Sequence, residues 1–67
     1  MDKQAILIEM IAKERENKIR NEIALAYALK TLEGAKLEEQ VKATNLAMTK
    51  NDDFISFLQE ELNKCSQ

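Results

Sequence analysis

The chain has 67 residues, and its ten lysines and arginines against twelve aspartates and glutamates give a formal charge of −2. At this length it can form only one small domain with a marginal core, which needs disulfides, a metal or association for stability. Cys65 is the only cysteine and histidine is absent, which excludes an internal disulfide and argues against a zinc site. We therefore expect no metal, no cofactor and a homo-oligomer, most simply a dimer.

Apolar and charged residues are both abundant, aromatic residues are few, and proline is absent. This composition is typical of long helices and coiled coils. No secretory signal is visible, and no apolar run approaches the roughly 18 residues of a membrane span. The sequence therefore predicts an all-α, cytoplasmic protein, residues 1–67 forming a single domain, with no membrane contact.

The first predicted helix covers residues 3–33, with Asp2 as a possible N-cap. Apolar clusters at 5–12 and 23–32 flank a polar segment at 13–22. This segment still favours a helix, because acid–base pairs at i,i+4 spacing each add about 0.2–0.5 kcal/mol: Glu9 with Lys13, Glu14 with Lys18, and Glu16 with Arg20.

Gly34, the only glycine, stands at the midpoint of the chain. A glycine just past a helix end commonly adopts a left-handed cap, which predicts a turn at about 33–36. Residue i would then face approximately residue 68 − i, so apolar clusters would meet at both ends and polar segments in the middle. This register would place Arg15 and Glu16 near Asn51–Asp53. The alternative is one long coiled-coil rod through Gly34.

The second predicted helix covers residues 37–65. Val41, Met48, Ile55 and Leu62 recur every seven residues, and a second series fills the complementary positions of a coiled-coil stripe: Leu37, Thr44, Asn51, Leu58 and Cys65. Asn51-Asp52-Asp53 favours caps and turns, so a break there would give a three-helix arrangement. The heptad phase continues across Asn51, which favours the unbroken helix.

A two-helix hairpin cannot enclose a core alone, so two copies are expected to pair into a four-helix bundle. Its shape resembles the small plasmid RNA-binding hairpin dimers, a likeness of architecture without a shared sequence motif. The apolar residues expected at the self-association or partner interface are Ile8, Ile19, Ile23, Leu29, Leu37, Val41, Met48, Ile55, Leu58 and Leu62.

The sequence contains few residues suited to catalysis, since it lacks histidine and a glycine-rich phosphate loop. We therefore expect that the protein is not an enzyme. Cys65 is interpreted as a small apolar residue at the edge of the stripe. The one basic concentration is Lys13, Arg15, Lys18 and Arg20, interspersed with glutamates.

The sequence favours a non-enzymatic helical module that self-associates and binds another protein, as a regulator, inhibitor, adaptor or assembly factor, for example an accessory protein of a phage. The alternative is a dimeric RNA- or DNA-binding bundle that uses the four basic residues.

Overall fold

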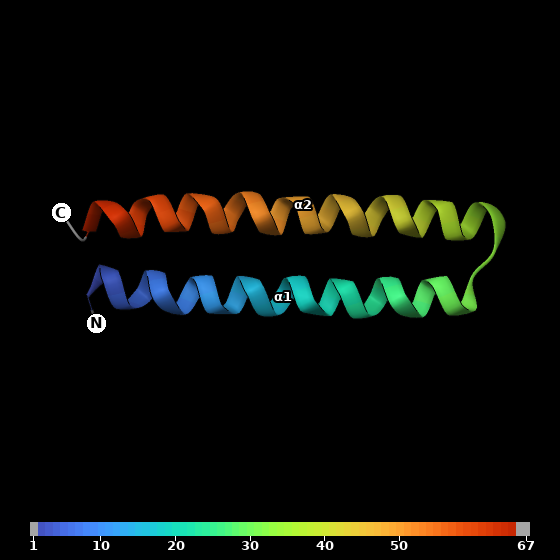
Figure 1. Cartoon of the computed structure of the whole chain (residues 1–67), viewed down its shortest axis with the longest axis horizontal. Helices are drawn as coiled ribbons and strands as arrows, with labels where there is room; N and C mark the ends of the chain where they lie inside the picture. The colour runs from blue at the N-terminus through green and yellow to red at the C-terminus, as the bar shows by residue number, and fades with distance from the viewer. Residues whose placement is uncertain (1, 66–67) are drawn as a thin grey trace.

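The structure, a computed structural model that describes residues 2–65, is an antiparallel hairpin of two long helices (Figure 1). Helix α1 spans Lys3–Thr31 and helix α2 spans Gly34–Cys65. They lie side by side along a molecule of 50 × 16 × 11 Å, with the start of α1 and the end of α2 at the same end. The predicted helices at 3–33 and 37–65 are confirmed to within three residues at each end, and the all-α hairpin is confirmed with them.

The ends of α1 are set by local hydrogen bonds. The carboxylate of Asp2 accepts a 2.7 Å hydrogen bond from the backbone N–H of Ala5, which is the N-cap that the sequence predicts. At the other end the N–H of Leu32 donates to the carbonyl of Ala28 at 2.9 Å, and the backbone of Leu32 is extended. The chain therefore leaves the helix at Leu32.

Gly34 has a φ of +61°, in the left-handed region that the sequence predicts for it. It differs from the prediction in position, because it opens α2 instead of ending α1. The connection is consequently shorter than the expected 33–36, with only Leu32 and Glu33 between the helices. Glycine fits here because a side chain makes a left-handed backbone costly.

Helix α2 is continuous through Asn51-Asp52-Asp53, so the three-helix alternative is wrong. Just before these residues, Thr49 donates its hydroxyl to the carbonyl of Asn45 within the same helix, at 3.0 Å. The hairpin also excludes the rod.

The two helices meet along a seam whose residues, in each helix, are spaced alternately four and three apart. The α2 side is the predicted stripe from Leu37 to Leu62, within which Leu58 is only 2 % exposed and Thr44 and Asn51 are also buried. The α1 side is contributed by Leu7, Ile11, Glu14, Lys18, Asn21, Leu25, Ala28 and Leu32, all buried or half-buried. Leu7, Ile11 and Leu58 form the apolar core near the chain ends, with Ile55 and Leu62 packed against it.

The register agrees with the prediction that residue i faces approximately residue 68 − i. Within residues 2–65, side-chain hydrogen bonds and ion pairs cross the seam between residues whose numbers add to between 64 and 72: Lys3 with Glu61, Glu14 with Asn51, Lys18 with Asp52, and Asn21 with Asn51. The polar middle of α1 thus lies against the polar middle of α2.

The α1 side of the seam was not predicted. The apolar α1 residues that the sequence analysis named for a self-association or partner interface lie outside the seam between α1 and α2. Their side chains are more than half exposed: Ile8, Ile19, Ile23 and Leu29. The chosen α2 residues do lie in the seam, where Leu58 is buried and Leu37, Val41, Met48, Ile55 and Leu62 are half-buried. Helix α1 therefore carries apolar side chains both on its seam and away from it.

Candidate functional site

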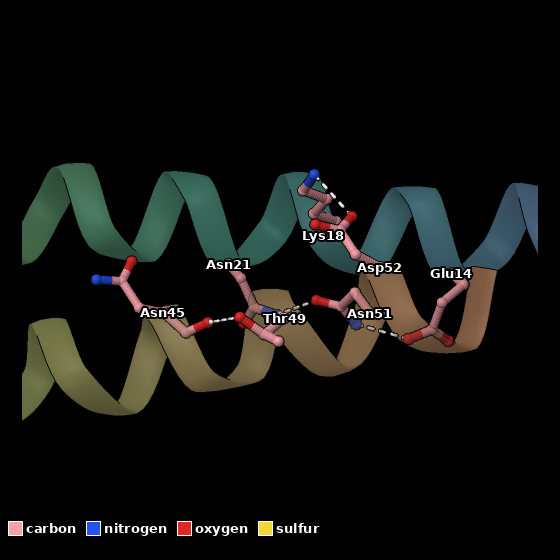
Figure 2. Close-up of polar contacts among 7 residues, drawn as sticks. All are labelled: Glu14, Lys18, Asn21, Asn45, Thr49, Asn51 and Asp52. Atoms are coloured by element: carbon pink, nitrogen blue, oxygen red, sulfur yellow. Dashed lines mark hydrogen bonds and ion pairs between the residues drawn. The ribbon is translucent and has the colours of Figure 1, made fainter. Parts of the chain in front are cut away.

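A polar cluster holds the middle of the seam together (Figure 2). The amide of Asn21 donates to the side-chain oxygen of Asn51 at 2.8 Å, and the amide of Asn51 donates to the carboxylate of Glu14 at 2.6 Å. Asn51 is 8 % exposed and uses its oxygen and its nitrogen on two residues of the opposite helix. Such polar seam residues fix the register of a coiled coil at a cost in stability.

Lys18 and Asp52 close the cluster towards solvent. The ammonium of Lys18 lies 2.8 Å from the carboxylate of Asp52, across the two helices (Figure 2). The hydrogen bond to Asp52, and then its charge, raise the pKa of Lys18 above its ordinary value of 10.5. Both side chains remain partly exposed, so this ion pair supports the register more than it stabilises the fold.

The residues in this cluster differ from those expected at the polar middle. The sequence placed Arg15 and Glu16 near Asn51, whereas Glu14 and Asn21 occupy that place. Glu16 instead accepts from the guanidinium of Arg20 on its own helix, at 2.9 Å. The expected pairing of Glu14 with Lys18 is also replaced, because each of them binds across the seam.

Two flanks of the hairpin follow from the register. Because the helices are antiparallel, the edge of α1 that carries Lys3 and the edge of α2 that carries Glu61 lie on the same side of the hairpin. An ion pair of 3.5 Å between these two residues joins the two edges. On the opposite side a groove is bounded by Ile8 and Arg15 of α1 together with Gln59 of α2. Residues three or four apart share a helix face, so each contact defines a continuous edge.

We call the first side the basic flank. It comprises residues of α1 and α2 at three- and four-residue intervals: Lys3, Ile6, Met10, Lys13, Arg20 and Tyr27, with Lys36, Lys50, Phe54, Phe57, Glu61 and Lys64. Within residues 3–64 this flank holds six lysines and arginines and a single acid, Glu61. The whole chain carries a charge of −2, so this flank has the opposite sign to the rest of the surface.

The one acid of the basic flank, Glu61, forms ion pairs with lysines of the same flank. Glu61 accepts from Lys64 at 3.1 Å and also lies beside Lys3. The hydrogen bond and charge of Lys64, and more weakly Lys3, lower the pKa of Glu61 below its ordinary value of 4.5. Lys13, Lys36 and Lys50 make no ion pair with any residue from 2 to 65, and their charges are open to solvent.

Exposed apolar side chains lie among these charges. Ile6 and Met10 share one edge with Lys3, and Phe54 and Phe57 share the other with Glu61. The two phenyl rings are stacked, with centroids 6.5 Å apart and planes 10° apart. Four large apolar residues are thus held at the end of the hairpin near the chain ends, which we call the apolar patch.

The four basic residues singled out from the sequence do not form one surface. Lys13 and Arg20 belong to the basic flank, whereas Arg15 borders the groove on the opposite side. Lys18 lies in the seam against Asp52. Sequence reasoning missed Lys36, Lys50 and Lys64, whose spacing of fourteen residues along α2 was the available signal.

Cys65, at the end of α2, is an exposed free thiol and so does not contribute to the seam. No group of three or more metal-ligating side chains gathers within residues 2–65. Neither α1 nor α2 contains the length of apolar sequence that a membrane-crossing helix requires.

No protein-family model, curated protein sequence or solved structure significantly matches this chain.

Proposed function

We propose that this hairpin is a non-enzymatic protein–protein interaction module that self-associates and binds an acidic amphipathic segment of another protein on its basic flank. The observation that carries the proposal is the apolar patch, Ile6 with Met10 and Phe54 with Phe57, set among unpaired lysines. An aromatic and aliphatic centre with a charged rim is the usual anatomy of a protein interface.

The chemistry of the flank defines the partner. Apolar anchors at three- and four-residue spacing would lie on the patch, as when an amphipathic helix is bound by a helical surface. Acidic residues beside those anchors would meet Lys13 and Lys50, raising the association rate and favouring one orientation. A regulator, inhibitor, adaptor or assembly factor works by binding of this kind.

The test is capture of partners from the native host in the presence of nuclease, with matched variants as bait. Phe54→Ser and Phe57→Ser, which remove the aromatic half of the patch, should lose the specific partner. Leu46→Ser is the control, because Leu46 is an exposed apolar residue of α2 outside the basic flank. Equal capture of the partner by the wild type and all three variants would contradict the proposal. So would a parallel capture without nuclease that recovers nucleic acid and no specific protein.

A second candidate is nucleic-acid binding on the same flank. It is favoured by the six basic side chains with one acid, interspersed with exposed aromatic rings on which bases can stack. This candidate moves the predicted contacts from Lys13, Arg15, Lys18 and Arg20 to Lys13 and Arg20 with Lys36 and Lys50.

Fluorescence anisotropy with labelled single- and double-stranded RNA and DNA tests this candidate. Binding should weaken steeply between low and moderate salt, because each phosphate contact releases counterions. Lys13→Glu with Lys50→Glu should abolish it, whereas Lys42→Glu, on the other side of α2, should not. Binding that resists both salt and the double reversal would contradict it.

A further inference from the structure

One exposed edge of α1 is complementary to itself when reversed. Starting at Ile8 and taking steps of four and three residues, this edge reads Ile, Ala, Arg, Ile, Glu, Ala, Leu and ends at Leu29. Its side chains lie on the flank opposite the basic flank, where Ile8, Ile19 and Leu29 are 53, 54 and 59 % exposed. The described residues of a single hairpin leave more than half of each of these side chains uncovered.

When this edge is laid antiparallel on the same edge of a second copy, with the two Ile19 side chains at the centre, each residue faces a residue of complementary size or charge. Ile8 faces Leu29, so apolar side chains meet at both ends. Ala12 faces Ala26, and these small residues let the two helix axes approach closely. The match is the one that a twofold interface requires, in which residue i contacts j and j contacts i.

Charge selects this orientation. In the antiparallel arrangement Arg15 of each copy faces Glu22 of the other, which gives two symmetric ion pairs beside the central Ile19. A parallel arrangement would place Arg15 on Arg15 and Glu22 on Glu22. Neither residue forms an ion pair with any other described residue, so both are available. Like-charge contacts across an interface are a recognised means of excluding the wrong orientation.

The groove on this side of the hairpin supplies a receiving surface. It has a volume of about 290 Å³, and four of its lining residues are Ile8, Ile11, Ala12 and Arg15. The spacing i, i+3, i+4, i+7 is that of a coiled-coil hole, which accepts one side chain from a facing helix. In the antiparallel register Ala26 of the second copy lies over this hole. Leu29 leans into it, because helical side chains point towards their own N-terminus.

We propose that the occupant of this edge is a second copy of the chain, with the two α1 helices packed antiparallel about a twofold axis at Ile19. The inference rests on the proposed self-association and specifies its interface. Because this interface covers one flank only, the basic flanks of the two hairpins face outwards on opposite sides of the dimer. Each dimer then presents two partner-binding surfaces.

Charge exchange at Arg15 and Glu22 tests the interface by sedimentation equilibrium, with circular dichroism confirming unchanged helicity. Arg15→Glu alone and Glu22→Arg alone each place like charges together twice, and each should weaken the dimer by at least about tenfold. The double variant should recover wild-type association. An equimolar mixture of the two single variants should form a heterodimer, which native mass spectrometry distinguishes by mass. Lys13→Glu, on the basic flank, is the matched control.

A cysteine at the axis gives a second and independent readout. In a Cys65→Ser background, Ile19→Cys should oxidise rapidly to a covalent dimer, because the two copies of this residue meet. Tyr27→Cys, at a position that is more exposed than Ile19 but lies on the basic flank, should form little disulfide-linked dimer. Folding of the hairpin is not at stake, since both side chains are on its surface.

The outcomes separate this inference from the proposed function. If the wild type is a dimer that neither charge reversal weakens, this interface is wrong while self-association stands. If the wild type is a monomer at every accessible concentration, self-association and this interface both fail, and partner capture on the basic flank is judged by its own experiment.

Discussion

Asn21 of α1 and Asn51 of α2 are thirty residues apart in sequence and joined by a 2.8 Å hydrogen bond between their side chains. Asn51 simultaneously donates to Glu14, so one buried amide binds two residues that lie about two turns apart on the opposite helix. Among the described residues no buried side-chain nitrogen or oxygen lacks a partner. This contact fixes which turn of α1 faces which turn of α2.

Asn51→Ala should therefore destabilise the hairpin. The change leaves Asn21 and Glu14 without their partner in a half-buried seam, and an unsatisfied polar group of this kind costs about 1–3 kcal/mol. Chemical denaturation at a fixed protein concentration measures the loss. Asn45→Ala is the control, because Asn45 is exposed and its side chain does not cross the seam; an equal loss in both variants would contradict the role of Asn51.

Replacing Glu14, Asn21 and Asn51 together with leucine should have the opposite effect on stability, because no member of the hydrogen-bonded cluster is then left without its partner. The seam becomes more apolar and the melting temperature should rise, while the constraint on register is relaxed. Sedimentation should then reveal larger or mixed assemblies where the wild type gives one species. A triple variant with a single well-defined mass would show that this polar cluster does not specify the pairing.

Gly34→Ala should destabilise the hairpin by about 1–2 kcal/mol, the cost of a left-handed backbone for a residue with a side chain. The new methyl group would meet no atom within 4 Å, so the cost comes from backbone strain and not from a clash. Gly34→Asn should cost less, because asparagine tolerates this conformation better. Thermal melting of both variants checks the order; a stabilised alanine variant would mean that the turn had been bypassed.

Leu58→Ala should cost about 2–5 kcal/mol, since it removes the most buried apolar side chain and leaves a cavity beside Leu7 and Ile11. Leu46→Ala is the matched control on the same helix, where the side chain is 57 % exposed and the expected cost is about 0.5 kcal/mol or less. Urea denaturation of both proteins gives the difference. Similar costs would indicate that Leu46 is covered in the assembled protein.

Acidification should weaken the contact that holds the two chain ends. The pKa of Glu61 is lowered in the folded state, so its contribution to stability is present above about pH 4.5 and is lost as the pH falls through the folded-state pKa. In Glu61→Gln this contribution is absent at every pH. The melting temperatures of the variant and the wild type should therefore differ at neutral pH and converge as the pH falls below the lowered folded-state pKa of Glu61; a constant difference would contradict the linkage.

The hairpin was predictable because its signals are local. One glycine without any proline places the turn, and the four-and-three spacing from Leu37 to Leu62 defines a single stripe on α2. The continuity of α2 across Asp52 also followed from that spacing. In α1 the spacing was ambiguous, because apolar residues occur on several sides of the helix and the seam itself contains Glu14, Lys18 and Asn21.

The sequence alone thus determined two helices, one turn and an approximate register, since helix periodicity and backbone preference act over a few residues. The tertiary structure decided which edge of α1 is buried, because Asn51 and Asp52 select Glu14, Lys18 and Asn21 as their partners. It also decided that lysines from both helices share one flank. That surface exists only when the chain is folded back at Gly34, because half of its lysines and arginines lie on α1 and half on α2. Antiparallel packing of the two helices turns both sets towards the same side.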